Sequence, residues 1–249
     1  MIPIPFVNFL IHIQIKIIAT IIFILVLAGC SQNEKDQSVI DEQIVKSPPK
    51  KLFQQDKGWW YARFRIHWPK KSKPRWHMGE MIAVEIINPI LLAHRADIDW
   101  WRFHRRAARD GHDHVFSFIF YSTPSIAEQI YSEIKQDAEL KQLQEEQQII
   151  WLGFDNPAKI GRPDLEDTSD KHWPIVIQKS WPKYIMGVSE MWLDVILQLT
   201  TEFEGQEQGE AKYRKIHHQF TELWKANGQH AWLHHLNALH AYQPFNVRY

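Results

Sequence analysis

WWYARFRIHW, residues 59–68, decides the fold of this chain, because its aromatic and β-branched residues stop at Pro69 as a β-strand does. Alternate residues of a strand face opposite sides of its sheet. One side carries Trp60, Ala62, Phe64, Ile66 and Trp68, and the other carries Tyr61, Arg63, Arg65 and His67. The pattern predicts one face packed on a core and one basic, aromatic face.

Three further strands are predicted downstream, at residues 99–106, 115–121 and 148–154. Asp110-Gly111 is the turn signal between the first two of them. The strand at 99–106 repeats the alternation, with Trp101, Phe103 and Arg105 against Trp100, Arg102, His104 and Arg106. Two of the predicted strands therefore contribute to the same basic face.

Helices are predicted between these strands. Residues 76–95 carry an apolar residue at every fourth position, with a kink at Pro89, and Thr123-Pro124 opens a second helix that runs to Gln147. The resulting order, β-α-β-β-α-β, is that of the ferredoxin-like split β-α-β unit. It predicts an α+β domain with one antiparallel sheet and both helices on one face.

The remainder of the chain is predicted to be a surface loop over 155–174 followed by helices at 184–203, 208–226 and 229–241, with Gly228 ending the second. These helices form a C-terminal helical annex. We expect residues 58–249 to be a single α+β domain, preceded by two segments of different character, residues 1–29 and residues 30–57.

Residues 1–29 contain one charged side chain, Lys16, and an apolar run from Ile17 to Gly29, as a secretory signal does. Residues 27–30, Leu-Ala-Gly-Cys, resemble a bacterial lipobox. That resemblance implies cleavage before Cys30, lipid on Cys30, and sorting to the outer membrane with the domain facing the periplasm. The alternative is a membrane-spanning helix, for which this run is long enough.

The polar residues 31–57, broken by Pro48-Pro49, are predicted to be a flexible tether with an end-to-end distance of roughly 28 Å. The complete chain also resembles a family of proteobacterial lipoproteins with the segments WRFHRRAARD and MGVSEMWLD. That resemblance implies the lipid anchor but no activity.

The basic, aromatic face is the predicted ligand-binding surface, formed by Tyr61, Arg63, Arg65, His67, Arg102, His104 and Arg106. Arginine forks beside aromatic rings suit carboxylates or phosphates, so an anionic ligand or an envelope protein is the expected partner. Residues 31–125 carry 16 basic and 11 acidic side chains, whereas residues 126–249 carry 12 and 18. The alternative is that the C-terminal helices cover this face and pair its arginines with their own acids, or that the arginines are merely solvated.

Composition excludes several classes of protein. Lys+Arg and Asp+Glu balance at 29 each, which argues against nucleic acid as a partner, and a lone Cys allows no internal disulfide. No Walker loop, GxGxxG, GxSxG, HExxH or CxxC pattern is present, so neither a cofactor nor a metal is predicted. The pairs His112/His114 and His230/His234 each lack a third ligand at a recognised spacing.

Two segments, WWYARFRIHW with WWRFHRRAARDGHDHVFSFIFYS, and HAWLHHLNALHAY near the C-terminus, resemble the glutamate-elimination domain of lantibiotic dehydratases and the related thiopeptide-type bacteriocin biosynthesis domain. The resemblance implies a lyase in which Arg63 or Arg65 supplies an arginine, and His235, or else His234, the histidine. The family's other two arginines are replaced here by Phe116 and Ala238. We therefore use the resemblance for the fold. A lyase or hydrolase acting on a peptide or glycan, with His235 as the acid-base group, is the alternative function.

Overall fold

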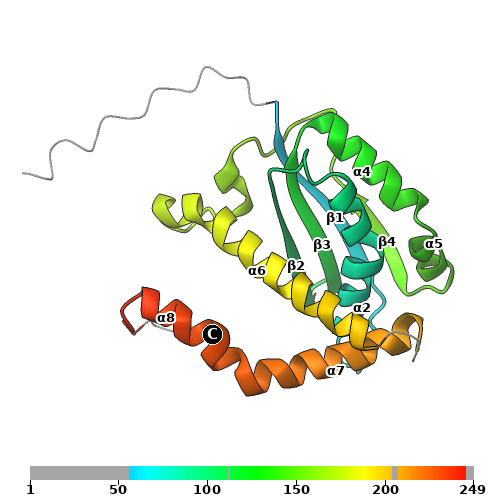
Figure 1. Cartoon of the computed structure of the whole chain (residues 1–249). Coiled ribbons are helices and arrows are strands. Elements are labelled where there is room, and N and C mark those ends of the chain that lie inside the picture. Colours follow the sequence, from blue (N-terminus) through cyan, green and yellow to red (C-terminus); the bar gives the residue numbers. More distant parts are fainter. Residues whose placement is uncertain (1–55, 112, 204–206, 245–249) are drawn as a thin grey trace, which may run out of the picture. The chain divides into compact units, whose positions relative to one another are not determined.

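The computed structural model describes residues 56–111, 113–203 and 207–244 (Figure 1). Cys30, the predicted signal and most of the predicted tether lie outside these residues. Four strands form the sheet: β1 (Gly58–Ile66), β2 (Trp100–Ala108), β3 (Asp113–Ser122) and β4 (Ile149–Phe154). They are hydrogen-bonded in the order β2-β3-β1-β4, and every neighbouring pair is antiparallel. This is the predicted ferredoxin-like arrangement in an α+β fold.

The first crossover between strands is a continuous helical segment of three parts, α2 (Trp76–Met81), the π-helix η1 (Ile82–Ile87) and α3 (Asn88–Ala93). The irregularity was predicted at Pro89 and lies just before it, in the π-helix, because Pro89 has no amide hydrogen to donate to the preceding turn and its ring crowds the carbonyl there. The second crossover was predicted as one helix and is two, α4 (Pro124–Gln136) and α5 (Ala138–Glu145). Asp137 breaks it and caps α5 by accepting from the amide of Leu140 (2.8 Å).

After β4, the chain passes through the short 3-10 helix η2 (Leu165–Thr168) into α6 (Ile175–Glu202). The helix α7 (Gly209–Gly228) continues without interruption into the π-helix η3 (Gln229–His234) and α8 (His235–Leu239). The prediction that Gly228 ends a helix is therefore wrong. The backbone of Gly228 is right-handed helical, and the indole ring of Trp224 occupies the space that a Cβ atom at this position would need.

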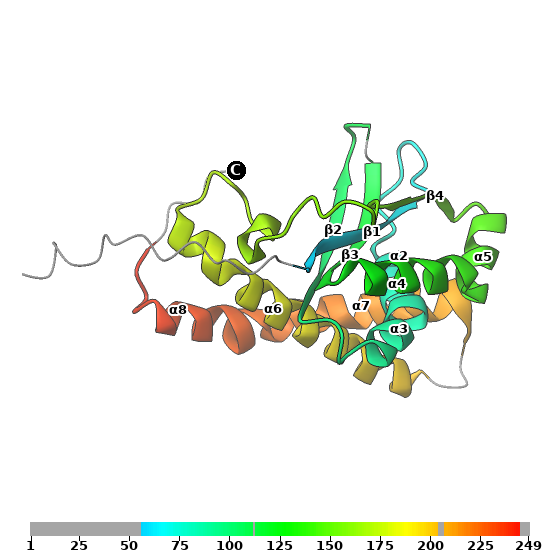
Figure 2. The same ribbon diagram turned by 90° about the horizontal axis from the view of Figure 1, so that it is seen from above.

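The core lies between the sheet and the helices that cover one of its faces (Figure 2). Phe64 on β1 and Phe118 on β3 are fully buried there, together with Ile86 and Ile130 from the two crossovers. The same core cluster includes Ile196 of α6 and residues of α7, so the C-terminal helices share the core of the sheet. Among the described residues, no helix has the length and apolar character that a membrane span requires.

Helix α7 is attached to α2 by buried polar contacts. Glu210 accepts from Arg75 (2.7 Å) and from the Nε2 of His77 (2.8 Å), and it also pairs with Arg214. One turn along, Glu80 is fully buried and its Oε1 lies 2.7 Å from Nδ1 of His217. These contacts hold the start of the C-terminal helices beside the first crossover helix.

The His77–Glu210 contact predicts acid sensitivity. Burial lowers the pKa of His77 from 6.5 to about 4, and the hydrogen bonds from Arg75 and His77 lower that of Glu210 from 4.5 to about 2, although burial opposes this second shift. In both cases the unfolded chain binds more protons than the native one. The free energy of unfolding should therefore fall as the pH drops from about 6.5 to 4 and further towards 2. Urea unfolding across this range measures it.

A matched pair of variants isolates this contribution to the pH dependence. Glu210→Gln should lower stability at pH 7 and flatten the part of the pH dependence below 4.5. Glu128→Gln, at an exposed position on α4, should leave the curve unchanged. A Glu210→Gln curve parallel to that of the wild type would contradict the assignment.

Candidate functional site

The face of the sheet opposite the core carries the predicted basic residues in two cross-strand rows. Strand register places Ser117 between Arg63 and His104, and it places Val115 between Arg65 and Arg106. Residues in register on one face are neighbours, so the two arginine-bearing strands flank small residues of the central strand β3. The alternation in the sequence is confirmed, and it brings Arg63, Arg65, His104 and Arg106 together.

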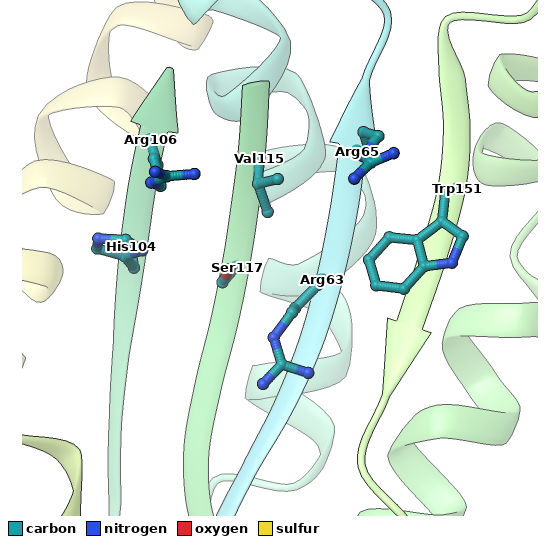
Figure 3. Close-up of a pocket in the computed structure, with 7 residues that line it drawn as sticks. All are labelled: Arg63, Arg65, His104, Arg106, Val115, Ser117 and Trp151. Carbon is teal, nitrogen blue, oxygen red and sulfur yellow. The ribbon is translucent and has the colours of Figure 1, made fainter. Parts of the chain in front are cut away.

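These residues enclose a hollow of about 660 Å³, which we call the basic hollow, and no acidic residue is among those that line it. Its lining residues are Arg63, Arg65, His104, Arg106, Val115, Ser117 and Trp151. Figure 3 shows His104 and Arg106 on β2 at one side, Ser117 and Val115 on β3 as the floor, and Trp151 on β4 beyond the two arginines of β1.

The arginines of the hollow are only partly neutralised. Arg63 pairs with Asp155 at 3.2 Å, and Asp155 is shared with Arg162. Arg106 pairs with Asp110 in the β2–β3 turn. These partners come from a loop and a turn, so the alternative in which acids of the C-terminal helices pair with these arginines is wrong. Arg63, Arg106 and Arg162 thus share the carboxylates of Asp155 and Asp110, so this part of the surface keeps a net positive charge.

Arg65 has no carboxylate partner among the contacts of the described residues. Its Nη2 donates to the carbonyl oxygen of Gly111 (2.8 Å), and its Nε is buried without a hydrogen-bond partner in the described part of the chain. The guanidinium lies 5.7 Å from the centre of the Trp151 ring. A buried N–H group without an acceptor lowers the stability of the fold. An anion bound in the hollow could accept the hydrogen bond that the Nε of Arg65 lacks.

His104 is the titratable group of the basic hollow. Desolvation lowers its pKa, and so does repulsion by Arg102 and Arg106, which precede and follow it on the same face of β2. An anion placed between these guanidiniums would oppose that repulsion and favour the imidazolium.

Trp151 lies flat on the sheet because its neighbour on the same face is a glycine. A Cβ atom at Gly153 would overlap the six-membered ring of the Trp151 indole. The register pairs Gly153 with Arg63 and Trp151 with Arg65, so the indole lies beside both arginines. Trp151 is 45% exposed and provides an accessible aromatic wall. Trp151 was not among the predicted binding residues, although alternation within residues 148–154 already places Trp151 and Gly153 on one face.

The other end of the same face is covered by the loop that follows β4. Trp59 donates from Nε1 to the carbonyl of Leu165 (3.0 Å), and Tyr121 donates to that of Pro163 (2.8 Å). Arg102 is held there too, because its Nε donates to Oγ1 of Thr168 (2.8 Å), and burial lowers its pKa. The loop therefore limits the open part of the face to the basic hollow.

Two of the remaining predicted binding residues lie away from the lining of the hollow. Tyr61 stacks under the guanidiniums of Arg63 (4.5 Å to the ring centre) and Arg162 (4.0 Å), so it orients a lining arginine. His67 follows the end of β1 and is exposed, with its amide bonded to the carbonyl of Gln148.

His235, the predicted acid-base candidate, lies on the exposed helix α8 and is not among the residues that line the basic hollow. The centre of its imidazole ring lies 5.5 Å from that of His230 and 5.4 Å from that of His234, two residues of the adjoining π-helix. The geometry therefore does not group His235 with Arg63 and Arg65 as the resemblance implies. Within the described part of the chain, no group of three or more His, Cys, Asp or Glu side chains could hold a metal ion.

Comparison of the chain with family models, with curated proteins and with solved structures gave no match.

Proposed function

We propose that this protein binds an anionic ligand in the basic hollow, while a lipid on Cys30 holds it in the cell envelope. The observation that carries the binding proposal is the lining itself, with three arginines and a histidine around small floor residues and no carboxylate among them. Charge-assisted hydrogen bonds from guanidinium groups are among the strongest in proteins, and their fork fits carboxylate, sulfate or phosphate oxygens.

The arrangement favours a small ligand or a protruding anionic group over an extended anionic polymer. The hollow is bounded by the loop after β4 at one end and by the β2–β3 turn at the other, where Asp110 adds a negative charge. The chain as a whole is electrically neutral. A long anion would thus meet acidic as well as basic surface, which is unfavourable for nucleic acid.

The proposal for location rests on the sequence. The lipobox-like residues 27–30 would place lipid on Cys30, and several acyl chains give a firm anchor where one chain would be marginal. With a tether of roughly 28 Å, the domain would remain near the membrane surface without entering it. We assign it to the outer membrane, facing the periplasm.

Sulfate binding tests the proposed function, because the charge of sulfate is constant between pH 7.5 and pH 5.5. Bound sulfate should raise the pKa of His104, so by linkage the affinity should increase as the pH falls. Each unit by which the pKa rises makes binding up to about tenfold tighter at the lower pH. Isothermal titration calorimetry on the full-length protein measures both affinities.

The variant His104→Gln should still bind sulfate but lose most of the pH dependence. His67→Gln, at an exposed histidine outside the hollow, should retain it. Absence of saturable sulfate binding at both pH values would refute the proposed function.

A further inference from the structure

A second hollow, which we call the tryptophan groove, lies between the β2 edge of the sheet, α6 and the segment that α7 forms with η3. Its volume is about 490 Å³, within the range of small-molecule sites. Aromatic side chains from the helices line it, namely Trp181, Trp192, Phe220, Trp224 and Trp232. Trp224 stacks on Trp232 with ring centres 5.2 Å apart and is 45% exposed.

The polarity of this groove is divided between its two sides. The side formed by β2 carries Arg102, His104 and Arg105, the helical side is aromatic and aliphatic, and no acidic residue lines the groove. Arg105 is engaged inside the protein, because its Nη2 donates to the carbonyl of Trp76 (2.6 Å). Arg102 is engaged as well, because its Nε donates to Thr168. His104 is thus the titratable side chain that remains exposed on this side of the groove.

Hydrogen-bond acceptors are scarce among the side chains that line the groove. Ser189 supplies the single neutral hydroxyl among its lining residues, and that hydroxyl already donates to the carbonyl of Ile185 (2.8 Å) and accepts from the amide of Phe103 (3.1 Å). The other polar side chains of the lining are mainly donors, namely the cations of β2 and the indole N–H groups, of which that of Trp192 is buried without a hydrogen-bond partner among the described residues. A sugar would therefore lose the hydration of its hydroxyl hydrogens and find few side-chain acceptors for them. An alkyl chain loses nothing of this kind and gains from the burial of apolar surface.

The tryptophan groove is continuous with the basic hollow through one residue. His104 lines both, since β2 is the edge strand and its exposed residue borders the open face as well as the side of the sheet. A single molecule that spans the edge of β2 would meet Arg106 and His104 at one end and Trp224 at the other. Such a molecule has an anionic head and an apolar tail.

We infer that the ligand is an anionic single-chain lipid, with its phosphate or carboxylate in the basic hollow and its acyl chain along the tryptophan groove. This inference rests on the proposed function for the position of the head, and it adds the chemical class of the ligand. The four tryptophans that line the groove then have a common role, because their large apolar rings cover the chain.

Three probes separate the head from the tail: methyl phosphate, octyl phosphate and 1-octanol. They are titrated at pH 7.5 into the full-length protein in phosphatidylcholine nanodiscs, with empty nanodiscs as the blank, by calorimetry. Each buried methylene group contributes about a fourfold gain in affinity. Octyl phosphate should therefore bind at least about a hundredfold more tightly than methyl phosphate, and more tightly than 1-octanol.

Variants locate the two ends of the bound molecule. Trp224→Gln should remove at least about tenfold of the affinity for octyl phosphate and leave methyl phosphate unaffected. Leu223→Gln is the matched control, since Leu223 is the adjacent residue, is 37% exposed and does not line the groove. Arg106→Gln should weaken octyl phosphate but not 1-octanol.

Each outcome distinguishes the inference from the proposed function. Equal affinity for methyl and octyl phosphate would refute the lipid inference while the proposed function stands. Octyl phosphate that binds no better than 1-octanol, and is indifferent to Arg106→Gln, would refute both. If octyl phosphate is the one probe whose binding is detected, and both Arg106→Gln and Trp224→Gln weaken it, the inference is supported. The affinity of methyl phosphate, which has a head but no tail, is then too low to measure.

Discussion

Glu80→Ala is expected to lower the free energy of unfolding by about 3–5 kcal/mol, the largest change in stability that we expect from any single substitution at a polar residue. Glu80 is fully buried, and its Oε1 lies 2.7 Å from Nδ1 of His217 and 3.5 Å from Nη2 of Arg105. The guanidinium carbon of Arg105 lies 5.3 Å from the centre of the Trp76 ring and 5.0 Å from that of Trp192. Removal of the carboxylate leaves this enclosed guanidinium without its acid. Urea unfolding at pH 7 measures the loss.

The double variant Glu80→Leu with Arg105→Met provides the control for this prediction. Replacing both members of a buried pair by apolar side chains of similar size is often close to neutral. The double variant should therefore be more stable than Glu80→Ala by at least about 2 kcal/mol. If Glu80→Ala costs less than about 1 kcal/mol, the contacts of the Glu80 carboxylate with Arg105 and His217 do not stabilise the fold.

Arg65→Gln combined with Arg106→Gln is expected to weaken sulfate binding at least about a hundredfold, because hydrogen bonds to charged groups contribute about 1.5–3 kcal/mol each. The two residues lie on opposite sides of Val115, so they reach the same anion from β1 and from β2. Fold stability should change little, since both side chains lie at the solvent face of the sheet. Calorimetry at pH 5.5 gives the affinity, and urea unfolding gives the stability.

Arg95→Gln is the control for the hollow, because it removes an exposed arginine that does not line the hollow and whose partner, Glu190, lies on α6. It should leave sulfate binding unchanged. Sulfate affinity in the double variant equal to that of the wild type would show that the anion binds elsewhere, even if the wild-type protein binds it.

Strand alternation made the sheet and its basic face predictable from the sequence. A period of two residues fixes which side chains share a face, and the register then follows from pairing the two apolar faces on one core. Arg63, Arg65 and His104 were identified in this way. The ends of the helices were less predictable, because the helical backbone continues through Gly228, where the rings of Trp224 and Trp232 pack, and an aspartate cap breaks the second crossover at Asp137.

The periodicity of the sequence could not predict the tertiary contacts of the site, because these join elements that are far apart in the chain. Nothing in the spacing of Tyr61 and Arg102 indicates that the loop after β4 closes over their end of the face. The burial of Glu80 depends on α7, more than 120 residues further along the chain. The role of His104 at the edge of the sheet likewise requires knowing that β2 is an edge strand and that α6 and α7 lie beside it.

The indole that lies over Gly153 has a consequence for how this sequence can diverge. Any side chain at position 153 would displace the ring of Trp151, so the two positions cannot vary independently. In related chains that conserve the basic hollow, glycine at 153 should accompany an aromatic residue at 151, and a larger residue at 153 should accompany a small one there. This paired variation would distinguish chains that bind the same ligand from chains that share only the fold.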